Sequence, residues 1–432
     1  MALSNQPIKG TKDWFPEEFT IRKYIFNTWR KVCQRYGYQE YLAPLMESAE
    51  MYRAKSGEDI AGPELMVFTD QGGRELALRP EMTPSITRMV TQIYESSAKP
   101  IRYFSIANFM RNEKPQRGRN REFWQLNVDI FGSNSINADL EIIQLALDIM
   151  LEFNPPKGSF LLCLNSRKLI DSLLDEILSI NPKSYPQTRI EITRTLDKWE
   201  KLSKEDCTAI LKEIGLDTLQ IETLSKYMSC QNLDELLTKM PELEGNEGIK
   251  ELKEVIIKLK ELGYGQWIEF KPNVVRGLDY YDGLVFEVFD NNPENNRALF
   301  GGGRYNGLAE LFGSQNIPAV GFAPGDETTK IFLESWGLVD QAREQNKIEL
   351  YYLPILDSKL ANDMQALAKK MRQENKNVVL GLEEQKINKA LDYANKQGID
   401  YVVILGSNEK DKNIYKIKNM QSGEETEESL NQ

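Results

Sequence analysis

The hydrophobic pattern changes three times along the chain, and these changes limit the folds that are possible. Up to about residue 153, strand-like runs stand between amphipathic helices. From about 156 to 262 the sequence is rich in Lys, Glu and Leu at helical spacing and poor in Gly. Strand signals then return, and from 348 onward short strands alternate with longer helices. This order predicts a strand-rich domain interrupted by a helical insertion, followed by a small α/β domain.

The domain boundaries follow from these changes of pattern. The first domain is expected to span 1–335, with the helical insertion at about 156–262. A polar linker is expected at 336–347, and the second domain at 348–432. We expect the first domain to contain a mostly antiparallel sheet with helices packed against it. The acidic tail after Gln421 is expected to be loose.

Individual elements are predicted from periodicity and from turn residues. In the first domain the pattern indicates helices at 17–37, 83–96 and 138–153, and strands at 38–45, 65–68, 75–78, 101–109 and 123–131. In the second domain it indicates strands at 349–354, 377–381, 400–405 and 414–418, and helices at 359–374 and 385–397.

The absence of histidine removes several mechanisms. None of the 432 residues is a histidine, so the chain has no Ser-His-Asp triad, no histidine base and no histidine metal ligand. The net charge of -11 argues against a positive coat for general nucleic-acid binding, although a local basic groove remains possible. Catalysis must therefore depend on carboxylates, arginines, lysines, backbone groups or a bound metal ion.

The cellular location is expected to be cytoplasmic. No apolar run approaches the length of a membrane span, and the first residues lack the pattern of a signal peptide. The four cysteines are scattered and form no CxxC pair, which is typical of reduced thiols. We expect no membrane association.

The most unusual segment is the basic run from Arg111 to Arg121. It carries five cationic residues and one anionic residue, a local charge of 5 − 1 = +4 in an acidic protein. Strand-like runs stand on both sides, so the segment is expected to be a loop between two strands. Guanidinium groups bind phosphate oxygens in pairs, which suits a polyphosphate or an RNA backbone. A solvated surface hairpin explains the charge equally well.

Three further segments combine charge, glycine and aromatic residues. In 79–83, RPEMT follows a strand: it can be a plain turn in which Thr83 caps the next helix, or it can place Glu81 in a pocket. In 276–281, RGLDYY can be core packing or a polar pocket wall. In 301–305, GGGRY can be a tight turn or a close approach of the backbone to a ligand.

The order and the amino-acid sequences of these segments resemble those of the histidyl-tRNA synthetase family, a group of class II aminoacyl-tRNA synthetases. The resemblance covers nearly the whole chain and is weakest in the insertion. It rests on Lys9–Asp13, Leu78–Glu81, Phe109–Gly132 (motif 2 of the family), Arg276–Tyr281, Gly302–Tyr305, Pro318–Phe322 (leading into motif 3) and Val379–Gly406.

The resemblance implies a fold, a reaction and partners. The fold would be an α+β class II catalytic domain with an antiparallel sheet flanked by helices, plus a C-terminal α/β anticodon-binding domain. The helix at 17–37 and the strand containing Pro44 match motif 1, which builds a homodimer. The enzyme would activate histidine with ATP, with Mg²⁺ on the released pyrophosphate. It would then transfer the histidyl group to tRNA(His).

The resemblance also implies roles for single residues, in three groups. Arg111 and Arg276 would act at the α-phosphate as catalytic residues, and Arg276 would partly serve where other class II enzymes place a metal ion, so no side chain is expected to bind one. The ATP site would contain Arg111, Glu113, Arg121 and Arg276, and the tRNA acceptor end would meet Gln116, Arg117 and Arg119. The amino-acid pocket would contain Glu81, Thr83, Gln125, Asp129, Tyr280 and Tyr281.

The sequence departs from the family pattern at a few positions. Thr328 stands where motif 3 has an ATP-binding arginine, and Asp129 stands where glutamate is frequent. Trp124 and Asn112 occupy motif 2 positions that are often histidine. These departures leave open an impaired paralogue that regulates or senses histidine or tRNA. A synthetase for another amino acid is disfavoured by the segment 276–281.

Overall fold

The computed structural model describes residues 3–54, 62–275, 280–295, 297–345 and 347–430. The chain divides into two compact units, Met1–Arg343 and Glu344–Gln432. The stretch 336–347, expected as a linker, contains helix α13 (Val339–Gln345). At its start the indole nitrogen of Trp336 donates to Asp290 at 2.9 Å, which ties this end to the first unit. No helix among the described residues has the length and apolar content that crossing a membrane requires.

The first unit is built on a sheet of eight strands. Their order is β1-β5-β6-β11-β10-β9-β7-β8, and all neighbours are antiparallel except β1 with β5 and β7 with β8. The expected mostly antiparallel sheet is therefore confirmed. The strands are β1 (Gln39–Glu40), β5 (Ile101–Met110), β6 (Glu122–Phe131), β7 (Phe160–Ser166), β8 (Ile268–Phe270), β9 (Leu284–Asp290), β10 (Ala298–Arg304) and β11 (Ala319–Phe322).

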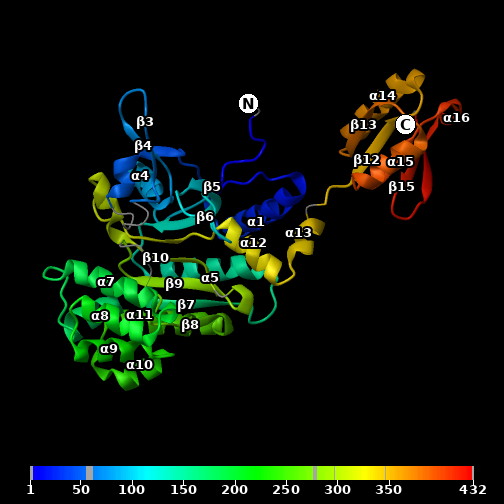
Figure 1. The fold of residues 1–432 in the computed structure, drawn as a ribbon. Helices are drawn as coiled ribbons and strands as arrows, with labels where there is room; N and C mark the ends of the chain where they lie inside the picture. The colour runs from blue at the N-terminus through cyan, green and yellow to red at the C-terminus, as the bar shows by residue number, and fades with distance from the viewer. Residues whose placement is uncertain (1–2, 55–61, 276–279, 296, 346, 431–432) are drawn as a thin grey trace. The chain divides into compact units, whose positions relative to one another are not determined.

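Helices cover one face of this sheet and the other face carries the candidate site. Helices α1 (Pro16–Arg35), α5 (Ile136–Glu152) and α12 (Asp326–Ser335) pack against the first face and bury Trp29 and Leu145 completely (Figure 1). On the opposite face lies α4 (Thr83–Ile93). Beside it are a small sheet, β2 (Met46–Ser48), β4 (Glu75–Leu78) and β3 (Met66–Thr69), and helix α2 (Ala49–Arg53).

The strand expected at 38–45 is much shorter than predicted. Only Gln39 and Glu40 pair with β5. The guanidinium of Arg79 donates to the carbonyl of Ala43 at 2.7 Å, and Pro44 has no N–H to offer to a ladder. These two features direct the chain away from the sheet edge.

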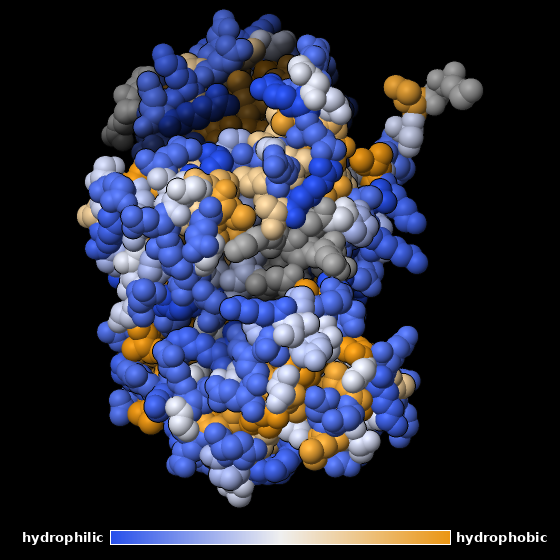
Figure 2. Space-filling model, turned by 90° about the vertical axis from the view of Figure 1, so that its left-hand side faces the viewer, coloured by the Kyte–Doolittle hydropathy of each residue, from blue (hydrophilic) through white to orange (hydrophobic). Residues whose placement is uncertain are grey.

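The helical segment begins later than the expected residue 156. The apolar run of β7 lies within that stretch, but it is a strand of the main sheet between β9 and β8. The helices that follow are α6 (Arg167–Ser172), α7 (Pro186–Asp197), α8 (Lys204–Glu213), α9 (Thr218–Met228), α10 (Leu233–Lys239) and α11 (Glu247–Glu261). Figure 2 shows one side of the molecule, with the helical segment at the bottom. Hydrophilic residues cover most of the visible surface, and scattered hydrophobic patches lie over the helical segment.

The second unit is a small α/β domain. Its sheet has the order β13-β12-β14-β15-β16, with parallel pairs on both sides of β12. Helix α14 packs in one apolar cluster and α15 in another. The elements are β12 (Leu350–Ile355), α14 (Ala361–Gln373), β13 (Asn377–Glu384), α15 (Ile387–Lys396), β14 (Tyr401–Ile404), α16 (Ser407–Asp411), β15 (Ile414–Asn419) and β16 (Glu425–Ser429).

The prediction of a loose tail after Gln421 is wrong. Residues Glu425–Ser429 form β16, which pairs antiparallel with β15. Lys418 lies 2.9 Å from Glu425, and Lys416 lies 3.9 Å from Glu427. The acidic residues of the tail therefore face lysines across the pair, and such opposite charges favour cross-strand pairing.

Candidate active site

The candidate site is built on the hairpin of β5 and β6. These strands pair along their whole length, with Ala107 opposite Gln125 and Tyr103 opposite Asp129. Because successive side chains of a strand point to opposite faces, Gln125 and Asp129 share the face that carries α4. The hairpin places two of the predicted pocket residues on one face of the sheet and the basic loop at its end.

Asp129 is buried next to a glycine and a tyrosine. Gly321 of β11 lies directly opposite, and a Cβ on it would stand 2.2 Å from Oδ1 of Asp129. The hydroxyl of Tyr305 donates to the same oxygen. Burial raises the pKa of Asp129 to about 7, although the bond from Tyr305 acts in the opposite direction. This carboxyl group can therefore gain or lose a proton near neutral pH.

Tyr280 contacts both Glu81 and Thr83. The hydroxyl of Tyr280 donates to Oε2 of Glu81 at 3.1 Å and lies 3.5 Å from Oγ1 of Thr83. Thr83 does not cap the following helix, as the plain-turn interpretation expected, because the N-cap residue is Met82 and no side chain caps the helix. The Thr83 hydroxyl instead faces the aromatic side of the pocket.

Three tyrosines line the space between the two carboxylates. The ring centroids of Tyr280 and Tyr281 are 4.9 Å apart, and those of Tyr280 and Tyr305 are 5.8 Å apart. Since Tyr280 contacts Glu81 and Tyr305 contacts Asp129, the cluster links both acidic groups. The result is a buried cluster of aromatic rings and carboxylates, a combination that suits a ligand with cationic or N–H groups.

Arg111 stands where β5 passes into the loop. Its Nε donates to the carbonyl of Pro80 at 3.0 Å, and its guanidinium lies 5.0 Å from the ring centroid of Phe123. Glu113 lies between two cations, 3.6 Å from Arg111 and 3.7 Å from Arg119. These contacts hold Arg111 beside the strand-to-helix turn that carries Glu81.

The basic loop is held at its base and at its tip. At the base, the N–H of Arg121 donates to the carbonyl of Gly10 at 2.7 Å. At the tip, Gln116 and Arg119 exchange two backbone hydrogen bonds around Gly118, which has φ +76°. The Nη1 of Arg297 donates to the carbonyl of Arg117 at 2.8 Å. The loop is therefore an ordered turn that presents several cations together.

Two further positions singled out in the sequence are Arg276 and Thr328. Arg276 lies outside the described residues. Thr328 uses its hydroxyl within the fold, where it lies 2.9 Å from the carbonyl of Leu299 and 3.1 Å from that of Gly325. The threonine therefore supplies no charge in place of the motif 3 arginine.

Sequence reasoning missed some contributors to the site. Tyr305 stood in a noted segment but was not assigned to the pocket, and nothing local in the sequence indicates that it reaches Asp129. No feature of the sequence indicated that Arg297 contacts the basic loop. In the same GGGRY segment, Arg304 forms a buried ion pair with Asp139 at 2.5 Å, so its role is structural.

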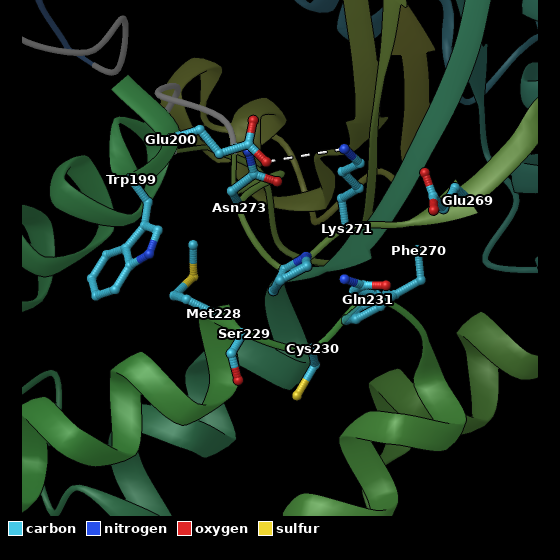
Figure 3. Close-up of a pocket in the computed structure, with 11 residues that line it drawn as sticks. Trp199, Glu200, Met228, Ser229, Cys230, Gln231, Glu269, Phe270, Lys271 and Asn273 are labelled. Atoms are coloured by element: carbon cyan, nitrogen blue, oxygen red, sulfur yellow. Dashed lines mark ion pairs between the residues drawn. The ribbon is translucent and has the colours of Figure 1, made fainter. Parts of the chain in front are cut away.

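A separate pocket lies between the helical segment and β8. It has a volume of about 310 Å³, and Figure 3 shows Trp199 and Met228 on one side and Lys271 and Asn273 on the other. Lys271 and Glu200 are 4.0 Å apart across it. None of the predicted site residues that the structure describes lines this pocket, so it does not define the chemistry described above.

Comparisons with known proteins identify the family of the chain. Residues 10–326 match the family model described as histidyl-tRNA synthetase, and residues 349–432 match the anticodon binding domain. A histidine–tRNA ligase of Leptospira biflexa is 38% identical over 97% of this chain and 94% of its own length. One from Pyrococcus horikoshii is 35% identical over 98% and 96%.

Solved structures show the same fold. The histidyl-tRNA synthetase from Nostoc sp. PCC 7120 superposes with a TM-score of 0.81 at 22% identity, covering 99% of this chain and 97% of that one. A Bacillus halodurans protein described as an ATP phosphoribosyltransferase regulatory subunit/histidyl-tRNA synthetase gives 0.74 at 22% identity, covering 91% and 97%.

Proposed function

The chain belongs to the histidyl-tRNA synthetase family, and from this membership we propose how its residues join histidine to tRNA(His) at the expense of ATP. The observation that carries the proposal is the pairing of a carboxylate pocket with an ordered basic loop on one β-hairpin. The pocket contains Glu81 and Asp129, and the loop begins at Arg111. A pocket for an amino acid thus lies at the base of a loop suited to phosphates.

The substrate histidine binds in the tyrosine-lined pocket. Its ammonium group binds Glu81, supported by Thr83 and Tyr280, because a buried carboxylate favours a cationic partner. Its imidazole faces Asp129, with Gln125 and Tyr281 completing the walls. A site built around polar partners rejects analogues that lack the matching N–H group, which gives selectivity.

The ATP binds along the base of the basic loop. Arg111 lies next to the turn that holds Glu81, so it contacts the α-phosphate where the histidine carboxylate attacks. Negative charge grows on the α-phosphate oxygens in that transition state, and a fixed guanidinium stabilises it without reorganisation of solvent. Glu113 and Arg121 orient the nucleotide, and Arg276 is proposed as the second catalytic cation. Mg²⁺ enters with ATP as part of the substrate.

The tRNA meets the chain at two places. Gln116, Arg117 and Arg119 at the loop tip contact the acceptor end, since arginines bind backbone phosphates. The second domain, proposed as residues 348–432, binds the anticodon. The catalytic domain is proposed as residues 1–335 with an insertion at 156–262, and 336–347 as the segment that joins the two.

The active form is proposed to be a homodimer in the cytoplasm, where transfer RNA is charged. Leu42, Leu45 and Met46 follow the edge strand β1 and are 70%, 38% and 51% exposed in the single chain. An exposed apolar group at a sheet edge is typical of a surface that another chain covers. We assign this surface to a second copy of the chain, in accordance with the position of motif 1.

Histidine-dependent exchange of pyrophosphate with ATP tests the activity, followed by charging of tRNA(His). Exchange that requires histidine, and no other amino acid, is the expected result. The second candidate is an impaired paralogue that regulates or senses histidine or tRNA, and Thr328 is the observation that favours it. Histidine binding without any exchange would support that candidate and contradict the enzyme.

A further inference from the structure

Three buried polar groups on the pocket face of the main sheet have no hydrogen-bond partner in the described part of the chain. They are the hydroxyls of Tyr41 and Ser105 and the Nδ2 of Asn127. Buried polar groups are nearly always paired, and leaving one unpaired costs about 1–3 kcal/mol. Three such groups together indicate that something outside the chain satisfies them.

The strand register places these three groups side by side. Ser105 lies directly opposite Asn127 on the β5–β6 pair. The parallel pairing of β1 sets Glu40 opposite Phe104, and the N–H of Tyr41 donates to the Phe104 carbonyl at 2.9 Å. Tyr41 therefore comes beside Ser105, at the edge of the same floor.

This floor adjoins the predicted substrate pocket. Asn127 stands between Gln125 and Asp129 on β6, and alternation points all three to the same face. The ring centroid of Tyr41 is 6.0 Å from that of Tyr103, which is the residue opposite Asp129. Burial raises the pKa of Tyr41, and the negative charge of Asp129 raises it further, which is consistent with their proximity.

The chemistry of the three groups complements that of Asp129. An ionised carboxylate only accepts hydrogen bonds, whereas a neutral imidazole has one N–H donor and one nitrogen acceptor. Asp129 can serve the donor side of the ring. The Asn127 amide and the Tyr41 and Ser105 hydroxyls can donate to the acceptor side, directly or through one bound water.

We propose that Tyr41, Ser105 and Asn127 form a polar floor that binds the imidazole ring of histidine opposite Asp129 and determines selectivity for it. This inference rests on the proposed function. It also explains how an aspartate, one methylene shorter than the glutamate frequent in the family, can belong to a selective pocket. The donors on β6, on β5 and just after β1 bind the other side of the ring, so recognition does not depend on the carboxylate alone.

The test uses the full-length chain with Tyr41→Phe, Ser105→Ala and Asn127→Ala. Each change removes the hydrogen-bonding group of one side chain, so we expect the KM for histidine in pyrophosphate exchange to rise about tenfold for at least Tyr41→Phe and Asn127→Ala. The KM for ATP should stay within about twofold. The preference for histidine over thienylalanine, whose ring has no nitrogen, should decrease.

A matched control separates this role from a structural one. Ser159 also has a buried hydroxyl without a partner in the described chain, but it precedes β7, which is separated from β6 by three strands of the main sheet. Ser159→Ala should leave the KM for histidine unchanged, and thermal unfolding of all variants shows whether they are folded.

Calorimetric titration with histidine makes the outcome independent of turnover. Weaker histidine binding in the floor variants, with normal binding in Ser159→Ala, supports the proposal even if exchange is absent. Unchanged histidine affinity in all three floor variants would overturn it while leaving the enzyme activity intact. Absence of exchange in the unmodified chain would overturn the proposed function instead, and absence of histidine binding would overturn both.

Discussion

At the scale of the residue, the site depends on side chains whose properties are set by what surrounds them. Arg111 is an ordinary arginine in the sequence, but Pro80 and Phe123 hold its guanidinium in one orientation. Asp129 is likewise an ordinary aspartate in the sequence, but in the fold it is enclosed by Gly321 and Tyr305. The chemistry of each comes from a neighbour far along the chain.

Arg111→Ala should lower kcat for pyrophosphate exchange about 100-fold or more, because a fixed charge at the α-phosphate is lost. Exchange kinetics at saturating histidine and ATP measure the effect. Arg74→Ala is the control, since Arg74 is 78% exposed and pairs only with Asp70 in the described chain. Turnover close to normal in Arg111→Ala would exclude the catalytic role.

Asp129→Asn should change how stability depends on pH. Because the pKa of Asp129 is raised to about 7 in the folded chain, the folded state holds its proton more tightly than the unfolded state does. Between pH 5 and pH 8 the unfolding free energy of the unmodified protein should therefore decrease by about 2 kcal/mol as Asp129 loses its proton. Asp129→Asn cannot lose this proton, so its unfolding free energy should not show this decrease.

Urea unfolding at the two pH values measures this difference. Burial also raises the pKa of Asp326, to about 6, and this shift is common to both proteins, so only their difference reports on Asp129. The exposed Asp234→Asn serves as control. Parallel pH profiles for the unmodified protein and Asp129→Asn would show that the buried carboxyl does not titrate in this range.

At the scale of the element, the conformation of the basic loop depends on the residues that contact its base and its tip. Five cations on a free hairpin would spread apart, because like charges repel. Here Gly10 fixes the base, where its φ of +94° and its close contact with Arg121 exclude a side chain. Arg297 fixes the tip from the start of β10.

Arg297→Ala should loosen the loop tip and affect the tRNA step more than the activation step. Loss of the hydrogen bond to the Arg117 carbonyl is worth about 1 kcal/mol, so kcat/KM for tRNA(His) should fall about fivefold. The KM for histidine should not change. Comparing charging with exchange measures the difference, with Arg343→Ala as an exposed control. An equal loss in both reactions would mean that Arg297 acts on the whole site.

At the scale of the whole molecule, the proposed dimer would cover an exposed apolar surface beside the site. The surface after β1 exposes Leu42 and Met46, and the same short strand leads to Tyr41 of the polar floor. A second copy on this surface would fix the edge strand and with it one wall of the pocket.

Leu42→Glu with Met46→Glu should convert the dimer into a monomer, because two charges would be buried in an apolar interface. Sedimentation velocity measures the mass, and histidine-dependent exchange should fall with it. Leu219→Glu is the matched control, since Leu219 is 72% exposed on α9. A dimer that survives the double change would place the interface elsewhere.

Most of the elements could be predicted from the sequence, since they depend on local patterns. The apolar period of 138–153 is the α5 helix, and the alternation around 101–109 and 123–131 is the β5–β6 hairpin. The identity and order of the charged segments were enough to indicate the family. These features are local, because helix and strand periods act over a few residues.

The tertiary structure decided what these elements contact. The bond from Tyr305 to Asp129 joins residues 176 positions apart, so no local pattern could predict it. The acidic tail is a strand because it pairs with β15, where lysines face its glutamates. The floor of Tyr41, Ser105 and Asn127 exists because three strands align in one register. Periodicity determines which face a side chain takes, but only long-range packing determines its partner and therefore its chemistry.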